Sequence, residues 1–146
     1  MTTMINFVKL NSMAKEPTRG SKYAAGYDLS AAISSNVMIA PHTTSKIGTG
    51  IAAELPDNTF GAIYARSGIA SKEGLRPANC TGVVDSDYRG EIVVALHNDS
   101  DVMRMVEPGE RIAQLVIQPY VSVEFEEVES LNTTDRGSGG FGSTGK

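Results

Sequence analysis

A short stretch near the middle of the chain concentrates the side chains best suited to chemistry. Gly82–Glu91 (GVVDSDYRGE) carries two carboxylates, a phenol ring and an arginine within five positions. Asp and Ser favour turns, Gly90 permits a positive φ, and β-branched residues lie on both sides, so the pattern predicts a hairpin. A turn that only reverses the chain needs one or two such residues, so this density indicates a site. The alternative is an ordinary solvated turn.

A second candidate lies where a strand meets the only expected helix. Tyr64–Gly68 (YARSG) leads into Gly68–Gly74 (GIASKEG), which is long enough for about two helical turns. A helix N-terminus offers free N–H groups and a partial positive charge, and Arg66 and Ser67 add donors. The segment therefore predicts a phosphate cradle. The alternative is that Ser67 is a plain helix N-cap.

Two polar residues interrupt apolar runs. Asp28 stands within Ala24–Leu29 (AAGYDL), and Gln114 stands within Gly109–Leu115 (GERIAQL). Alternation along a strand puts Ile112 and Gln114 on one face. Gln114 therefore either faces a cavity or meets a buried hydrogen-bonding partner.

The end of the chain differs in composition from the rest. Residues 132–146 are rich in glycine, serine and threonine, and they carry Arg136 and Phe141. Such a segment is disordered when free, but its amides converge on anions, an arginine clamps phosphate and a phenyl ring stacks on a base. We expect a folded domain over residues 1–131 and an arm over residues 132–146 that orders as a lid over a phosphorylated ligand. The alternative is a flexible tail without a role.

These five glycine-bordered sites complement one another chemically. They carry Asp, Arg-Ser, Asp-Tyr, Gln and Arg-Phe, which suit a metal, a phosphate, a sugar, a water molecule and a base respectively. The combination is unlike a chance distribution.

The elements that must position these residues are short strands. Apolar residues alternate with period two, turn formers separate the runs, and the runs recur about every ten residues, which predicts an all-β antiparallel sandwich or barrel. The expected strands cover residues 5–10, 24–32, 37–39, 46–53, 59–65, 91–96, 102–106, 112–117 and 121–125.

Composition narrows the class of protein. The chain has 146 residues, a formal net charge of −4 and one cysteine, so we expect one domain without an internal disulfide. The net charge makes direct nucleic-acid binding unexpected. The sequence has no apolar run of the roughly 18–20 residues that span a membrane, and its start lacks a signal peptide, so we expect a cytosolic protein.

The sequence closely resembles the homotrimeric dUTP pyrophosphatases (dUTPases). Five motifs occur in the order found in that family: residues 24–29, 65–68 (ARSG), 82–90, 109–115 and 136–145 (RGSGGFGSTG). The resemblance implies a jelly-roll β-barrel that forms a homotrimer with three active sites at subunit interfaces. It also implies hydrolysis of dUTP to dUMP and pyrophosphate with Mg²⁺, which limits uracil in DNA and supplies dUMP for thymidylate synthesis.

The same resemblance assigns roles in water activation and nucleoside recognition. Asp85 orients and deprotonates the attacking water, which Gln114 helps to hold. Tyr88 lies under the deoxyribose and excludes a 2′-hydroxyl. The uracil edge meets Asn79 and the backbone of residues 80–84, including Gly82 and Val84.

The remaining roles concern the phosphates and the arm. Arg66, Ser67 and Gly68 hold phosphates, and Asp28 holds Mg²⁺ through coordinated water. From a neighbouring subunit, the arm closes over the site. Arg136 clamps the terminal phosphate, Phe141 stacks on uracil, and residues 142–145, including Gly142 and Ser143, supply amides and hydroxyls.

Two other functions compete with this interpretation. One is the related dCTP deaminases, which share the barrel; the complete arm and the Asp85–Tyr88 pair argue against it. The other is a nucleotide-gated regulatory protein with the same fold, which usually carries an additional domain or insertion.

Overall fold

The computed structural model describes residues 2–145, and most of its elements are short strands. The single helix among them has seven residues, which confirms the all-β prediction. No helix within this range is long and apolar enough to cross a membrane. The elements are β1 (Asn6–Lys9), β2 (Tyr27–Ser30), β3 (Val37–Ile39), β4 (Thr44–Gly48), β5 (Ile51–Glu54), β6 (Thr59–Tyr64), α1 (Ser67–Glu73), β7 (Leu75–Pro77), β8 (Gly82–Asp85), β9 (Val93–Asn98), β10 (Arg104–Val106) and β11 (Arg111–Pro119).

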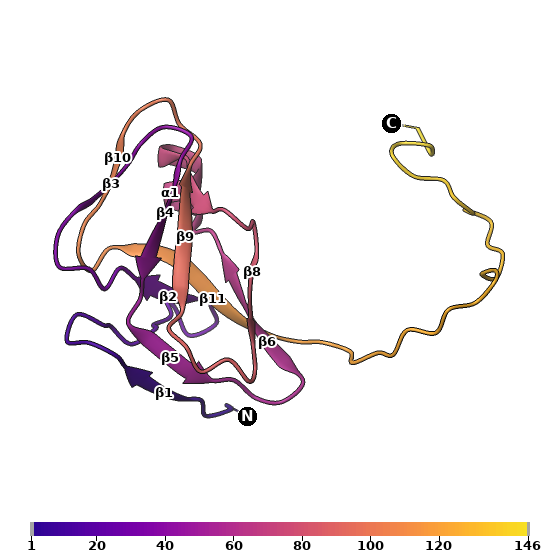
Figure 1. Ribbon diagram of the computed structural model, residues 1–146, viewed down its shortest axis with the longest axis horizontal. Helices are drawn as coiled ribbons and strands as arrows, with labels where there is room; N and C mark the ends of the chain where they lie inside the picture. Colours follow the sequence, from indigo (N-terminus) through magenta and orange to yellow (C-terminus); the bar gives the residue numbers. More distant parts are fainter. Residues whose placement is uncertain (1, 146) are drawn as a thin grey trace.

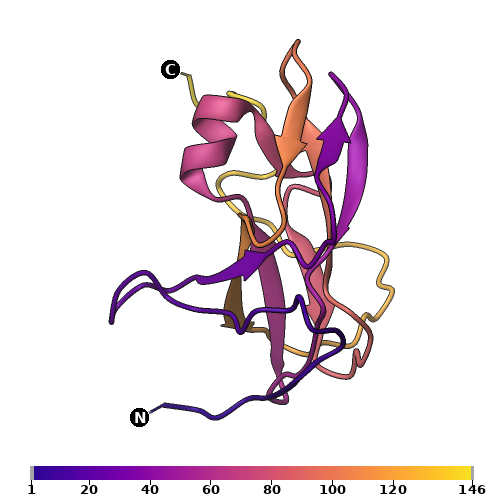
Figure 2. The same cartoon turned by 90° about the vertical axis from the view of Figure 1, so that its left-hand side faces the viewer.

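The strands form two larger sheets and two strand pairs, all antiparallel. One sheet has the order β2-β11-β6-β8 and the other the order β4-β9-β7, while β1 pairs with β5 and β10 pairs with β3. Helix α1 lies at the end of the molecule opposite the N-terminus (Figures 1 and 2). The antiparallel arrangement predicted from alternation is confirmed.

The core fills the space between the sheets with aliphatic side chains. Because side chains alternate across a strand, one face of each sheet supplies this core. Its fully buried large members are Leu29, Ile39, Ile47, Ile51, Leu75, Leu96 and Ile112. The two buried polar residues among those described, Thr49 and Asn98, both have hydrogen-bond partners. β2 and β11 contribute Leu29 and Ile112 to this core, so the core anchors the two strands that carry Asp28 and Gln114.

The single strand expected over residues 46–53 is in fact two strands. β4 ends at Gly48 and β5 begins at Ile51, and the two belong to different sheets. Gly50 has φ +66, and a Cβ there would lie 2.7 Å from the Cβ of Ala14. The apolar pattern runs without a break across residues 46–53, so it gave no sign of the sharp turn at Gly50. The positive φ and the close packing there require glycine.

The predicted hairpin over Gly82–Glu91 is also wrong. β8 pairs with β6 in the four-stranded sheet, whereas β9 pairs with β4 and β7 in the other sheet. The connection that begins after Asp85, the last residue of β8, and carries Tyr88 therefore crosses from one sheet to the other. Local turn residues cannot distinguish such a crossing from a hairpin, because the strand partners are distant in sequence.

The strand expected over residues 121–125 is not formed. β11 ends at Pro119, and the last hydrogen bond between this end of the described chain and the body runs from the Tyr120 amide to the carbonyl of Asn58, in the turn before β6, at 3.1 Å. From there the chain runs away from the body of the molecule as an extended segment (Figure 1). Val121 and Phe125 are 83% and 98% exposed, so their alternation has no partner surface within the described chain.

Candidate functional site

Asp28 is the centre of a compact cluster of charged groups. It lies on β2, and its Oδ1 accepts a hydrogen bond from Arg66 Nε at 2.9 Å while its Oδ2 accepts one from Arg111 Nη1 at 3.2 Å. The side chains of Asp28 and Arg66 are only 15% and 25% exposed. Two guanidinium groups thus hold one sheltered carboxylate and keep further N–H donors for an anion.

Gln114 joins this cluster through strand register. On β11 it lies opposite Asp28 of β2 on one side and Tyr64 of β6 on the other. Its Nε2 donates to the Ala65 carbonyl at 2.8 Å. A side chain on Gly26 would collide with the Gln114 amide oxygen, so the close approach requires glycine there. The polar partner expected for Gln114 is therefore the backbone just before Arg66.

Helix α1 begins immediately after Arg66. Arg66 occupies the N-cap position with extended backbone angles, and no side chain there caps the first turn. Ser67 is the first helical residue, so its interpretation as the N-cap is wrong. Ser67 and Gly68 are exposed, and a Cβ on Gly68 would meet nothing within 4 Å. This leaves open space beside Gly68, two residues after Arg66.

The connection after β8 holds Tyr88 in a defined position. The Tyr88 amide donates to the Asp85 carbonyl at 3.1 Å, and the Tyr88 hydroxyl donates to the Glu91 carbonyl at 2.8 Å. The ring lies so close to Gly90 that a Cβ there would collide with it. Arg89 Nη1 donates to the Ser86 carbonyl at 2.8 Å, so this arginine stabilises the turn.

Asp85 and Tyr88 line a shallow cavity of about 210 Å³ together with Val84 and other residues from 83 to 93. Asp85 itself is exposed. At the other end of β8, a Cβ on Gly82 would lie 3.2 Å from Asn79 Nδ2, so Asn79 folds back over the start of the strand. β8 thus has Asn79 beside its start and Asp85 at its end, with Tyr88 just beyond.

The structure places Asp85 far from the Asp28 cluster. Asp85 lies opposite Phe60 and Gln114 lies opposite Tyr64, at the two ends of β6. Four residues along a strand span about 13 Å. Within the described range of residues 2–145, no hydrogen bond or ion pair joins Asp85 or Tyr88 to the Asp28 cluster. One chain therefore carries two separate parts of the expected site.

The glycine-rich segment forms local turns away from both parts. Arg136 Nε donates to the Gly139 carbonyl at 2.8 Å, and the Ser143 amide donates to the Gly140 carbonyl at 3.0 Å. Phe141 is fully exposed, with φ +51. Gly142 follows with φ +84. The aromatic ring and the arginine are therefore free to meet another surface.

Among residues 2–145, no group of three or more His, Cys, Asp or Glu side chains is arranged to hold a metal ion. Asp28 has two arginine hydrogen bonds on its carboxylate, which weakens it as a direct metal ligand. Its remaining lone pairs suit a hydrogen bond from a metal-bound water. The donor set fits Mg²⁺ held mainly by substrate phosphates, because Mg²⁺ retains several of its waters.

Sequence reasoning missed two arginines that organise the site. Arg111 donates a hydrogen bond to Asp28. The only indication of this role in the local sequence is that Arg111 stands three residues before Gln114 in the same motif. Arg76 holds the loop that carries Asn79, and nothing in the local sequence indicated this. The hydrogen bond and charge of Asp99 raise the pKa of Arg76, and Arg76 in turn lowers the pKa of Asp99.

Comparison with known proteins identifies the family. The sequence model of dUTPase matches residues 12–145. This chain belongs to the dUTPase family. The deoxyuridine 5′-triphosphate nucleotidohydrolase of Corynebacterium glutamicum is 48% identical over 97% of this chain and 95% of its own length. The enzyme of the same name from Oryza sativa subsp. japonica is 42% identical over 97% of this chain and 81% of its own length.

The solved structures agree with the sequence relatives. A Staphylococcus bacteriophage 80alpha dUTPase G164S mutant with dUpNHpp superimposes with a TM-score of 0.91 at 30% identity, over 99% of this chain and 100% of that one. The jelly-roll fold expected of dUTPases is confirmed by this match. Family membership assigns dUTP hydrolysis to the chain. The deaminase and regulatory alternatives are not favoured, because the relatives bear the hydrolase name.

Proposed function

We propose that dUTP is hydrolysed in sites that three copies of this chain build together as a homotrimer. The observation that carries this proposal is the separation of Asp85 and Tyr88 from the Asp28 cluster along β6. The exposed apolar residues after β11 and the outstretched arm also lack partners within the described chain. In a closed trimer each copy donates different groups to neighbouring sites.

The first copy supplies the nucleoside side of the site. Asn79 and the backbone at Gly82 and Val84 bond the uracil edge, and Tyr88 packs under the deoxyribose. The Tyr88 hydroxyl is bonded to the Glu91 carbonyl, so the ring cannot easily move aside for a 2′-hydroxyl. Rejection of cytosine follows because its exchanged donors and acceptors leave polar groups of the site unpaired.

Asp85 then acts on the attacking water. It accepts a proton from the water as the water oxygen bonds to the α-phosphorus, and the bond from that phosphorus to the β-phosphate oxygen breaks. The products are dUMP and pyrophosphate. A carboxylate is a weak base, but positioning the water in line provides much of the rate enhancement. Gln114 from another copy contacts this water or a phosphate oxygen.

A second copy supplies the phosphate side. Arg66 keeps its Nη groups for the phosphates while its Nε bonds Asp28, and Ser67 and Gly68 add a hydroxyl and amides. Asp28 would hold Mg²⁺ through a coordinated water. When bound, Mg²⁺ offsets negative charge on the pyrophosphate leaving group. Holding the cluster in place before substrate arrives reduces the reorganisation needed for reaction.

A third copy supplies the arm of residues 132–146, and the extended segment that follows β11 lets this arm reach beyond its own body. Arg136 clamps the terminal phosphate, Phe141 stacks on the uracil, and Gly142 and Ser143 bond the phosphates. Closure excludes water other than the one that reacts. We further expect a cytosolic location and no direct binding to nucleic acid or membrane.

A panel of nucleotides tests the substrate directly. The protein is incubated with Mg²⁺ and each of dUTP, dCTP, dTTP and UTP, and released pyrophosphate and ammonia are measured. We expect pyrophosphate from dUTP alone. Ammonia from dCTP would indicate a deaminase, and nucleotide binding without turnover would indicate a regulatory protein.

A further inference from the structure

The loop before β8 depends on contacts outside itself for its shape. Residues 77–81 carry Asn79, and two of their backbone hydrogen bonds are internal: Cys80 N to Pro77 O at 3.1 Å and Thr81 N to Asn79 O at 2.7 Å. Cys80 has φ +58, a left-handed conformation that is unfavourable for a residue with a side chain. Pro77 pairs with Leu96 of β9, and the Ala78 amide donates to the Ala95 carbonyl at 2.7 Å, so β9 holds the start of the loop. The part around Cys80 needs a further contact to hold its left-handed backbone in place.

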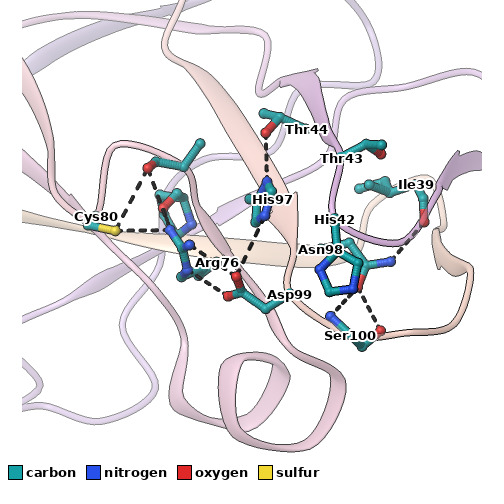
Figure 3. Close-up of polar contacts among 12 residues, drawn as sticks. Ile39, His42, Thr43, Thr44, Arg76, Cys80, His97, Asn98, Asp99 and Ser100 are labelled. Atoms are coloured by element: carbon teal, nitrogen blue, oxygen red, sulfur yellow. Dashed lines mark hydrogen bonds and ion pairs between the residues drawn. The ribbon is translucent and has the colours of Figure 1, made fainter.

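Arg76 makes the required contacts. Its Nη1 lies 3.3 Å from the Pro77 carbonyl oxygen and 3.5 Å from the Ala78 carbonyl oxygen. The same nitrogen lies 2.9 Å from Cys80 Sγ. One guanidinium nitrogen thus contacts three residues of the turn, as Figure 3 shows for Cys80.

Asp99 fixes the other side of that guanidinium. Arg76 Nε donates to Asp99 Oδ2 at 2.6 Å and Arg76 Nη2 donates to Asp99 Oδ1 at 3.0 Å, which is a two-pronged ion pair (Figure 3). The hydrogen bond from Arg76 lowers the pKa of Asp99, so the pair is ionised at neutral pH. Such paired contacts fix orientation as well as distance.

The position of Asp99 is itself fixed by the core. Its neighbour Asn98 is fully buried, donates to the Ile39 and Val102 carbonyls at 2.9 and 2.8 Å, and accepts from the Ser100 amide at 2.9 Å. The Asp99 amide donates to the Gly74 carbonyl at 2.8 Å. A continuous set of bonds therefore runs from the buried Asn98 through Asp99 and Arg76 to the loop.

We propose that Arg76, held by Asp99, is a positioning residue for base recognition that sets the loop of residues 77–81 against the uracil edge. The inference rests on the proposed role of Asn79. Arg76 does not itself contact the base. Removing its guanidinium frees the turn at Cys80, so the donors and acceptors of the loop no longer meet uracil in one geometry.

The test compares base selectivity with sugar selectivity in the full-length protein. For Arg76→Ala we expect KM for dUTP to rise about tenfold with kcat within about threefold, because the lost contact serves the bound substrate and the transition state alike. The kcat/KM preference for dUTP over dCTP falls about tenfold. The preference for dUTP over UTP is unchanged, because Tyr88 lies at the other end of β8. A general packing defect would alter both preferences.

Three further variants sharpen the result. Asp99→Asn removes the charged partner and reproduces the loss of base selectivity. Asp101→Asn is the matched control, because Asp101 lies in the same loop and contacts His42 at 2.8 Å, and it leaves selectivity unchanged. Arg76→Lys keeps the charge but lacks the planar fork, so it does not restore selectivity.

The outcomes separate this inference from the proposed function. If Asn79→Ala lowers base selectivity while Arg76→Ala and Asp99→Asn do not, the positioning role is wrong and the role of Asn79 stands. If Asn79→Ala leaves base selectivity intact, the proposed base-reading loop is wrong and the inference falls with it. Should Arg76→Ala fail to fold, the comparison of Asp99→Asn with Asp101→Asn decides.

Discussion

The Asp28 cluster and the Gly82–Glu91 segment provide different parts of the proposed site in different ways. Asp28 is sheltered and bonded by two arginines, and Gln114 beside it is bonded to the backbone before Arg66. Asp85 and Tyr88, by contrast, are exposed, and the hydrogen bonds that shape the segment around Tyr88 lie within it.

This difference indicates which part of the substrate each region meets in the proposed site. Phosphates carry most of the charge of dUTP, and a preassembled cluster of arginines meets that charge without rearrangement. The segment with Asp85 is outward-facing, as our proposal that another copy holds the phosphates requires. Changes to the two regions should therefore have distinct effects on turnover, binding and selectivity.

The largest expected effect comes from Asp85→Asn. Turnover of dUTP should fall by about 10²–10⁴, the usual range for a positioned general base, while the dissociation constant for dUTP stays nearly the same. Single-turnover kinetics and equilibrium binding measure the two quantities. Asp87→Asn is the matched control two residues away and should retain activity. Unchanged turnover in Asp85→Asn would remove Asp85 from this role.

Deletion of residues 136–146 should produce the second largest loss. We expect a folded trimer with kcat/KM lower by roughly 10², because an open site positions the phosphates and the water poorly. Light scattering reports the assembly and pyrophosphate release reports the activity. Aggregation or dissociation of the shortened protein would mean that the arm is a structural clasp and not a lid.

Gly26→Ala disturbs only the phosphate side. The new Cβ would collide with the Gln114 amide oxygen and displace the bond to the Ala65 carbonyl, so we expect kcat/KM to fall about tenfold. The preference for dUTP over UTP should persist, because Tyr88 is distant. Gly20→Ala is the control, since a Cβ there meets nothing within 4 Å. Equal losses in both variants would contradict the close contact.

The smallest expected effect concerns acid pH and the loop at Asn79. The charged groups that face Asp99 are Arg76, His97 and His42, and together they lower its pKa. A carboxyl group with a lowered pKa stabilises the fold above its unfolded pKa and loses that contribution as pH falls through the folded value. Base selectivity should thus be constant near neutral pH and decline only as the pH falls through the lowered pKa of Asp99. Asp99→Asn should show no such decline.

Sequence patterns singled out the candidate site residues but not the connections between them. Glycine-bordered motifs singled out Asp28, Arg66 and Gln114, and register then brought these three together. The ion pairs of Arg111 with Asp28 and of Arg76 with Asp99 join residues 83 and 23 positions apart. Such pairs follow from register and loop geometry, which no local pattern encodes.

Fold prediction failed where the strand partner was distant or absent. The turn residues of Gly82–Glu91 are typical of a hairpin, but β6, β4 and β7 supply the actual strand partners. Residues 121–125 alternate like a strand, yet they lie outside the body of the molecule (Figure 1). Alternation of apolar and polar residues indicates that one face of a segment is buried. It does not indicate whether the same chain or another chain covers that face.

Mixing two inactive variants tests the shared site most directly. Asp85→Asn and Arg66→Ala are each purified, combined in equal amounts, unfolded and refolded together, and assayed for pyrophosphate release from dUTP. If Asp85 of one copy acts with Arg66 of another, random assortment in a trimer restores both groups in about a quarter of the sites. We predict recovery of about a quarter of wild-type activity. No recovery above the separate variants, with mixed trimers confirmed by mass spectrometry, would show that one chain builds its site alone.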